Sequence, residues 1–95
     1  MTTLTWARVA LSPRAQATLE QLTEAQRVRF WQIVSVIKNA PDEGAFYMRN
    51  SDGSIARQMT GADTHVIYTV RFWPIGRVLL IVLIEINDWV PWYIN

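Results

Sequence analysis

The side chains that could carry chemistry in this sequence are few, and they centre on one histidine. His65 is the single histidine, and histidine is the side chain that most readily takes up and releases a proton near neutral pH. The sequence has no cysteine, which excludes a thiol nucleophile and any cysteine-based zinc or iron–sulfur site. A single histidine also excludes zinc sites built from several histidines.

Arginine supplies eight of the nine basic residues, and Lys38 is the exception. Arginine is the better residue for bidentate contact with phosphate or carboxylate. The formal net charge is only +1, so no strong overall field attracts nucleic acid or a membrane. Arg49, Arg71 and Arg77 would follow a phosphate backbone if the fold gathers them, and are ordinary surface arginines if it does not.

Ninety-five residues are enough for one domain with one core, so we expect a single domain over residues 1–95. Apolar residues make up 51% and include five tryptophans, more apolar area than a small core hides. Trp89 and Trp92 therefore either cover a sheet edge or anchor a partner. The longest apolar run, Val78–Ile84, is too short to span a membrane, and no signal peptide precedes it. These features predict a cytoplasmic protein.

The first half of the chain predicts a strand followed by two helices. Thr3–Leu11 is rich in β-branched and apolar residues and is typical of a strand. Ser12-Pro13 is a helix start, because serine caps free amides and proline suits the first turn. Thr23 and Gln26 form a capping box for a second helix that should end near Asn39, before Pro41.

The second half changes to a period of two with regular turn signals, which indicates an antiparallel meander. The expected strands are Ala45–Asn50, Ser54–Met59, Thr64–Phe72 and Val78–Asn87. The fold class is therefore α+β: an N-terminal strand, a helical hairpin and an antiparallel meander of three to four strands. The apolar stripe of the hairpin must cover one face of that sheet.

Alternation assigns side chains to the two faces of the sheet. In Thr64–Phe72 the apolar set lies under the helices, and it comprises Val66, Tyr68, Val70 and Phe72. In Val78–Asn87 the even-numbered positions from Val78 to Ile86 are all apolar. The open face should then hold His65, Arg71, Glu85 and Asn87. Alternation leaves the direction of Arg57 undecided.

The ordered set of segments resembles the RelE/ParE superfamily of small bacterial toxins from type II toxin–antitoxin pairs. The stretches that carry the resemblance span nearly the whole chain, in family order: Leu11–Ala15 with Leu19 and Leu22, the helix end Asn39-Ala40-Pro41, the strand His65–Val70, and the last apolar strand Leu79–Ile86. The resemblance implies a four-stranded, mostly antiparallel sheet with a helical hairpin on one face. It implies no metal or organic cofactor.

The resemblance also implies partners. RelE-like members enter the ribosomal A site and cut mRNA, using the 2′-hydroxyl as nucleophile, and this activity is the leading expectation for the chain. The alternatives are a ParE-like toxin that inhibits DNA gyrase, and a degenerate, non-toxic member that acts only through protein binding. RelE-like and ParE-like toxins are both held inactive by a cognate antitoxin. The apolar surplus fits an antitoxin strand or helix, and a homodimer is the other use for such a surface.

Three residues are candidates for the cleavage chemistry that the resemblance implies: His65 as base, Arg57 as the cation for developing phosphate charge, and Tyr93 as acid. His65 stands where the family has an arginine before the strand tyrosine. Each has a structural alternative. His65 could simply bond a polar neighbour, Arg57 could pair with Glu85 across the sheet, and Tyr93 could belong to a packing lid.

Overall fold

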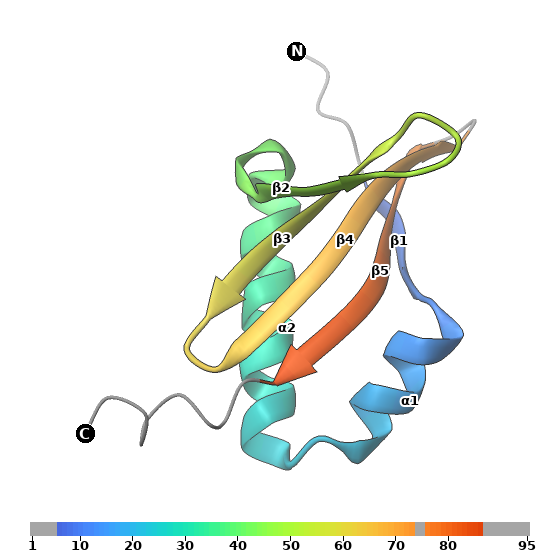
Figure 1. Cartoon of the computed structure of the whole chain (residues 1–95). Coiled ribbons are helices and arrows are strands. Elements are labelled where there is room, and N and C mark those ends of the chain that lie inside the picture. The colour runs from blue at the N-terminus through green and yellow to red at the C-terminus, as the bar shows by residue number, and fades with distance from the viewer. Residues whose placement is uncertain (1–5, 74–75, 87–95) are drawn as a thin grey trace.

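The computed structural model describes residues 6–73 and 76–86 (Figure 1). The elements follow the predicted order of strand, helical hairpin and meander, and the α+β fold class is confirmed. They are β1 (Trp6–Leu11), α1 (Pro13–Gln21), α2 (Glu24–Asn39), the short 3-10 helix η1 (Pro41–Glu43), β2 (Ala45–Arg49), β3 (Ile55–Gly61), β4 (Thr64–Trp73) and β5 (Gly76–Ile86).

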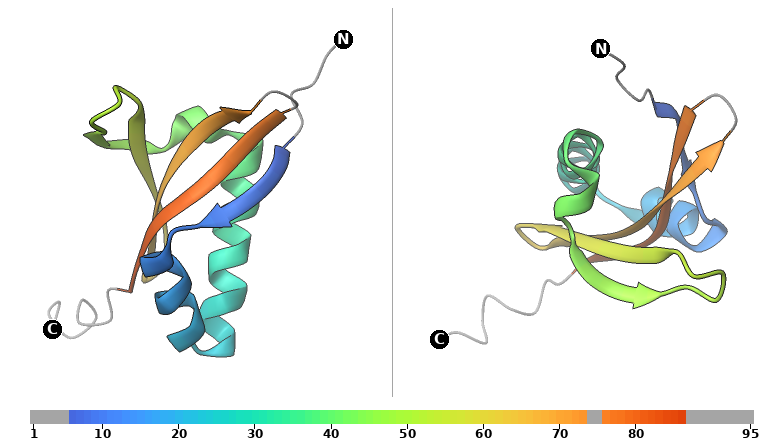
Figure 2. Two further views of the ribbon diagram at one scale, coloured as in Figure 1. Left: turned by 90° about the vertical axis from the view of Figure 1, so that its right-hand side faces the viewer. Right: turned by 90° about the horizontal axis from the view of Figure 1, so that it is seen from above.

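The five strands form one sheet in the order β1-β5-β4-β3-β2. β2 to β5 make an antiparallel meander, and β1 returns to pair in parallel with β5 (Figure 2). The number of strands exceeds by one the four that the family resemblance implies, because β2 pairs with β3 as a further edge strand. β4 is therefore the central strand, and β5 and β3 on either side of it also have both edges paired.

Ser12 joins three elements at one point. Its backbone N–H donates to the Ile81 carbonyl at 2.9 Å, and its hydroxyl donates to the Val82 carbonyl at 2.6 Å. The same hydroxyl oxygen accepts the Ala15 N–H at 3.0 Å, which is the N-cap bond predicted for α1. Ser12 thus links the end of β1, the start of α1 and the middle of β5.

The predicted capping box at the start of α2 is present, with reciprocal bonds between Thr23 and Gln26. α2 ends at Asn39, before Pro41, as the sequence predicts. The Arg27 guanidinium donates to the carbonyls of Leu19 and Glu20 in the last turn of α1. The Leu19 carbonyl also accepts the Leu22 N–H, and the Glu20 carbonyl is one that the helix end leaves free, so Arg27 ties the end of α1 to the start of α2.

Both helices cover the same face of the sheet (Figure 1), and one apolar core lies between the helices and the sheet. Cross-strand partners share a face, and the pairs Val66 with Ile84 and Tyr68 with Ile81 lie in this core. The helices contribute the buried side chains Ala15, Leu22, Phe30, Ile33, Val34 and Ile37. Neither α1 nor α2 is long and apolar enough to cross a membrane.

A β-bulge at Val82 changes the predicted faces of β5. Ile67 pairs with Leu83 and Tyr68 pairs with Ile81, so Val82 is an extra residue. On the N-terminal side of Val82 the alternation is shifted by one residue. Leu79 and Ile81 therefore face the helices, as Ile84 does on the other side of the bulge. The prediction that the even-numbered positions from Val78 to Ile86 share one face is therefore wrong for Val78 and Leu80.

The outer side of α2 carries apolar side chains that are not buried. Val28, Trp31 and Val36 widen the apolar stripe of this helix in the sequence, yet they are 53%, 44% and 53% exposed. Trp31 packs edge-on against Phe30, with ring centroids 4.8 Å apart. The core takes four α2 side chains, Phe30, Ile33, Val34 and Ile37, and the 3.6-residue helical repeat turns the three exposed side chains away from them.

The α2–β2 connection is held by Tyr68 from the centre of the sheet. The Tyr68 ring is 1% exposed, and its hydroxyl donates to the Pro41 carbonyl at 2.6 Å. Burial raises the pKa of this phenol, against the opposing effects of the Gly44 N–H and the Arg57 charge. A methyl group at Gly44 would overlap the Tyr68 hydroxyl, so the close approach explains the glycine.

Ser12→Ala should destabilise the protein more than a cap loss alone. A lost serine cap costs ~0.5–2 kcal/mol and a carbonyl left without its donor adds ~1–3 kcal/mol, so we expect about 2–4 kcal/mol in urea unfolding. Thr23→Ala is the matched control, because it removes a cap that has no bond to the sheet, and it should cost about 1 kcal/mol. Equal losses would show that the Ser12–Val82 bond contributes nothing.

Candidate functional site

The face of the sheet opposite the helices, here called the open face, carries His65. The register pairs His65 with Thr60 on β3 and with Glu85 on β5. Arg71 also projects to this face, as expected, because it lies six positions after His65 on the same strand and alternate side chains share a face. Asn87, expected here as well, lies outside the described residues.

The His65 imidazole is positioned by a neighbour on β3. Its Nδ1 lies 3.1 Å from the Thr60 hydroxyl, and the side chain is half-buried. A histidine whose Nδ1 is engaged in this way leaves Nε2 for another partner. Glu85 stands directly opposite on β5, where Cβ atoms are typically about 4.5–5.5 Å apart. Thr60, His65 and Glu85 are therefore neighbours on the open face, and the imidazole is the group among them suited to proton transfer.

Arg57 lies on the other side of the sheet. It pairs in register with Tyr68, whose side chain faces the helices, and its guanidinium donates to the Gly44 carbonyl at 3.0 Å. It lines a cleft of about 310 Å³ between η1 and the sheet, together with Asp42, Ile55 and Val70. Arg57 therefore does not pair with Glu85, and the structure does not bring it together with His65.

The remaining predicted site residues near the chain end cannot be compared with this geometry. Tyr93, Trp89 and Trp92 lie outside the described residues. Their roles as acid and as partner anchors stay predictions. Of the three predicted catalytic residues, His65 alone has a described position on the open face.

Arg49, Arg71 and Arg77 share one end of the sheet but do not form a continuous track. Arg49 donates to the Gly53 carbonyl at 3.1 Å, and Arg71 forms an ion pair with Asp52 in the same β2–β3 turn. Arg71 and Arg77 point to opposite faces, because they pair with neighbouring positions of the facing strand. Two of the three are thus engaged with one turn.

The charge of Asp52 is strongly favoured in this turn. Hydrogen bonds from the Ser54 side chain and backbone, followed by the one from Arg71, hold the pKa of the Asp52 carboxyl far below its usual range. Asp52 therefore stays ionised and keeps Arg71 occupied across the physiological pH range.

A second ion pair ties α2 to the β3–β4 turn. Arg29 Nε lies 2.9 Å from Asp63 Oδ1, and the Thr64 hydroxyl donates to the same oxygen at 3.0 Å. Burial alone would raise the pKa of Asp63, but the Thr64 hydrogen bond and the Arg29 charge outweigh it, and the net shift is downward. This pair fixes the turn that begins β4 and so positions His65.

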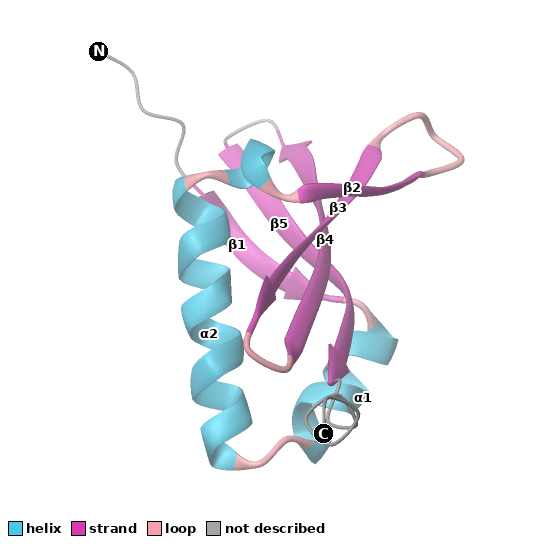
Figure 3. Ribbon diagram, turned by 60° about the vertical axis from the view of Figure 1, so that its left-hand side comes forward, coloured by secondary structure: helices cyan, strands magenta, loops and turns pink. Residues whose placement is uncertain are grey.

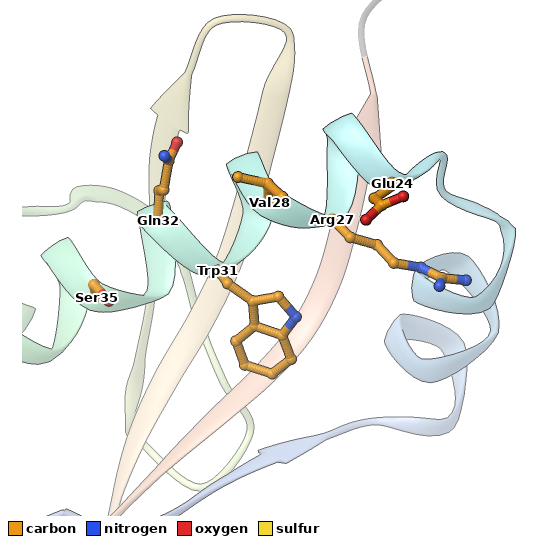
Figure 4. A pocket seen from close by; sticks show the side chains of 6 residues that line it. All are labelled: Glu24, Arg27, Val28, Trp31, Gln32 and Ser35. Atoms are coloured by element: carbon orange, nitrogen blue, oxygen red, sulfur yellow. The ribbon is translucent and has the colours of Figure 1, made fainter.

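The outer face of α2 forms a broad shallow hollow (Figure 4). It has a volume of about 730 Å³ and is lined by Glu24, Arg27, Val28, Trp31, Gln32 and Ser35. The Trp31 ring stands away from the helix axis, beside a charged end formed by Glu24 and Arg27. An aromatic and aliphatic surface with a polar rim is typical of a protein-binding site.

No three carboxylate or histidine side chains among residues 6–73 and 76–86 group in a way that could hold a metal ion. Thr60 is the site residue that sequence reasoning missed, because it was assigned to the turn. Counting a two-residue turn at Ala62-Asp63 places Thr60 opposite His65, and the positive φ of Ala62 fits such a turn.

The open sheet and the covering hairpin are shared with a solved toxin. The chain matches the structure titled as an archaeal RelE–RelB complex from Pyrococcus horikoshii OT3, with a TM-score of 0.61 and 19% identity over 85% of this chain and 94% of that one. The fold is therefore that of the RelE-type toxins. No protein-family model and no curated protein matches the sequence.

Asp52→Asn should release Arg71 and strengthen binding of single-stranded RNA. We expect tighter binding and a salt dependence steeper by about 0.7 in log–log slope, the value for one added phosphate contact. Glu20→Gln is the matched control, since it removes the same charge from an exposed position on α1 and releases no arginine side chain. Equal affinities of the two variants, measured by fluorescence anisotropy, would contradict a role for this end of the sheet.

Proposed function

We propose that this chain is the toxin of a toxin–antitoxin pair, and that it inhibits translation by ribosome-dependent cleavage of mRNA. The observation that supports this most is the fold shared with a RelE captured together with RelB, over nearly the full length of both chains. A cognate antitoxin that holds the chain inactive is part of the proposal.

His65 is the base in this proposal. It would take the proton from the RNA 2′-hydroxyl, while Thr60 keeps the imidazole oriented at 3.1 Å and Glu85 stabilises the charge that forms. Tyr93 remains the proposed acid. Arg57 does not keep its role as phosphate cation, because its guanidinium lies on the helix side. Arg71 shares the open face but stands six residues along the strand, roughly 20 Å from His65.

The antitoxin is proposed to bind the exposed apolar side of α2. Val28 and Trp31 are about half exposed there, and they lie in a hollow whose rim carries one acidic and one basic side chain, Glu24 and Arg27. An amphipathic helix recognises such a surface through apolar anchors spaced by three and four residues. Trp89 and Trp92 stay proposed as further anchors.

A second candidate is a ParE-like toxin that blocks DNA gyrase without nuclease chemistry. The favouring observation is the shortage of cations beside His65. Arg57 is the one basic residue between Ser54 and Thr64, and it lies on the helix side. Without a cation near the base, a phosphorane would lack the charge stabilisation that cleavage requires.

Purified chain added to ribosomes programmed with a defined mRNA should cut the message in the A site. His65→Ala should lower the cleavage rate by about 10²–10⁴-fold, the usual contribution of a general base. Thr60→Val should cause a smaller loss, because it only frees the imidazole. Gln21→Ala, on the exposed end of α1, is the control and should cut normally.

Two results would reject this mechanism: an intact message at the highest toxin concentration, or wild-type cutting by a folded His65→Ala variant. Inhibition of DNA supercoiling by gyrase in the same preparation would move the assignment to the second candidate.

A further inference from the structure

The edge of the sheet formed by β2 has features of an unoccupied pairing surface. β2 is last in the strand order and pairs with β3 on one side only. All five of its residues are exposed. Figure 3 shows the β2–β3 turn reaching beyond the rest of the sheet, away from α2. The outer backbone groups of β2 can therefore accept another strand.

The side chains of β2 are unusual for an edge strand. Phe46, Tyr47 and Met48 are consecutive and are 59%, 42% and 48% exposed. Natural edge strands are normally protected by lysine, proline or an inward-pointing charge, and Ala45–Met48 contains none of these. The bulge between Phe46 and Met48 is the one protective feature, and it leaves the apolar side chains exposed.

The bulge also distributes the apolar side chains over both faces. Phe46 pairs in register with Arg57, which is on the helix side, and Met48 pairs with Ala56, which is on the open face. A strand added at this edge would contact apolar side chains on both faces of the sheet. A second β2 strand carries apolar side chains on both of its faces, so it matches this edge.

The charges at the two ends of β2 favour a second copy of the chain in antiparallel orientation. Asp42 and Glu43 precede the strand, and Arg49 ends it. Antiparallel pairing centred on Phe46 sets Glu43 of one copy beside Arg49 of the other, twice by symmetry. Parallel pairing would instead set like charges together. Arg49 uses one N–H for Gly53 and has further donors for a carboxylate.

We propose that two copies of this chain pair through antiparallel β2 strands, extending each sheet across the two-fold axis. The three exposed side chains offer roughly 300 Å² of apolar area per copy, which is below what a stable interface buries and fits a weak one. The dimer should therefore dissociate reversibly in the micromolar range. This surface is separate from the α2 hollow, so the dimer does not depend on toxin function.

Sedimentation equilibrium of the purified chain, over about 1–100 µM, tests the proposal in the range where weak interfaces dissociate. The wild type should reach a monomer–dimer equilibrium. Phe46→Lys should weaken it by about tenfold or more, because the side chain lies at the centre of the interface. Ala17→Lys adds the same charge at an exposed site on α1 and should leave the equilibrium unchanged.

Charge reversal tests the orientation. Glu43→Arg and Arg49→Glu should each weaken the dimer, and the double variant should restore it, because the exchanged charges face each other again. Failure of the double variant to recover would overturn the antiparallel register. A monomer at the highest concentration would overturn the dimer. Binding of an antitoxin segment that Phe46→Lys abolishes, with the free chain monomeric, would assign the edge to that partner instead.

Discussion

The bond between the Ser12 hydroxyl and the Val82 carbonyl is the contact on which the arrangement of this fold depends. It holds the extra residue of β5 in place, and that residue decides which β5 side chains face the helices. With the bulge, Leu79, Ile81 and Ile84 all enter the core. The bulge lets Ile81 enter the core while Glu85 keeps the position on the open face, opposite His65, that alternation predicts for it. One side chain at the start of α1 therefore contacts the residue at which the alternation of β5 changes.

Local sequence signals were sufficient to predict the helices and strands. The Ser12 cap, the Thr23 capping box and Pro41 each act over a few residues, and the structure has all of them where the sequence predicts. It was harder to predict which β5 side chains face the helices, because the bulge is stabilised by a contact with a residue 70 positions away along the chain. Val28 and Trp31 show a different limit. Their apolar character suggests burial, but their positions in the helical repeat lie away from the core side of α2.

The candidate site was predictable in part for the same reason. Alternation along β4 was enough to set His65 and Arg71 on the open face, since that strand has no bulge. The direction of Arg57 required the register between β3 and β4, which depends on the length of the turn at Ala62-Asp63. The ion pair of Arg71 with Asp52 required the shape of a turn in another hairpin. Chemistry that needs several strands cannot be read from one strand at a time.

Inducible expression of the chain alone, followed by pulse labelling of new protein and new DNA, decides whether the proposed toxin acts on translation. Growth should stop, and incorporation into protein should fall before incorporation into DNA. Unaffected growth with the folded chain present, or loss of DNA synthesis first, would overturn the proposed action on translation.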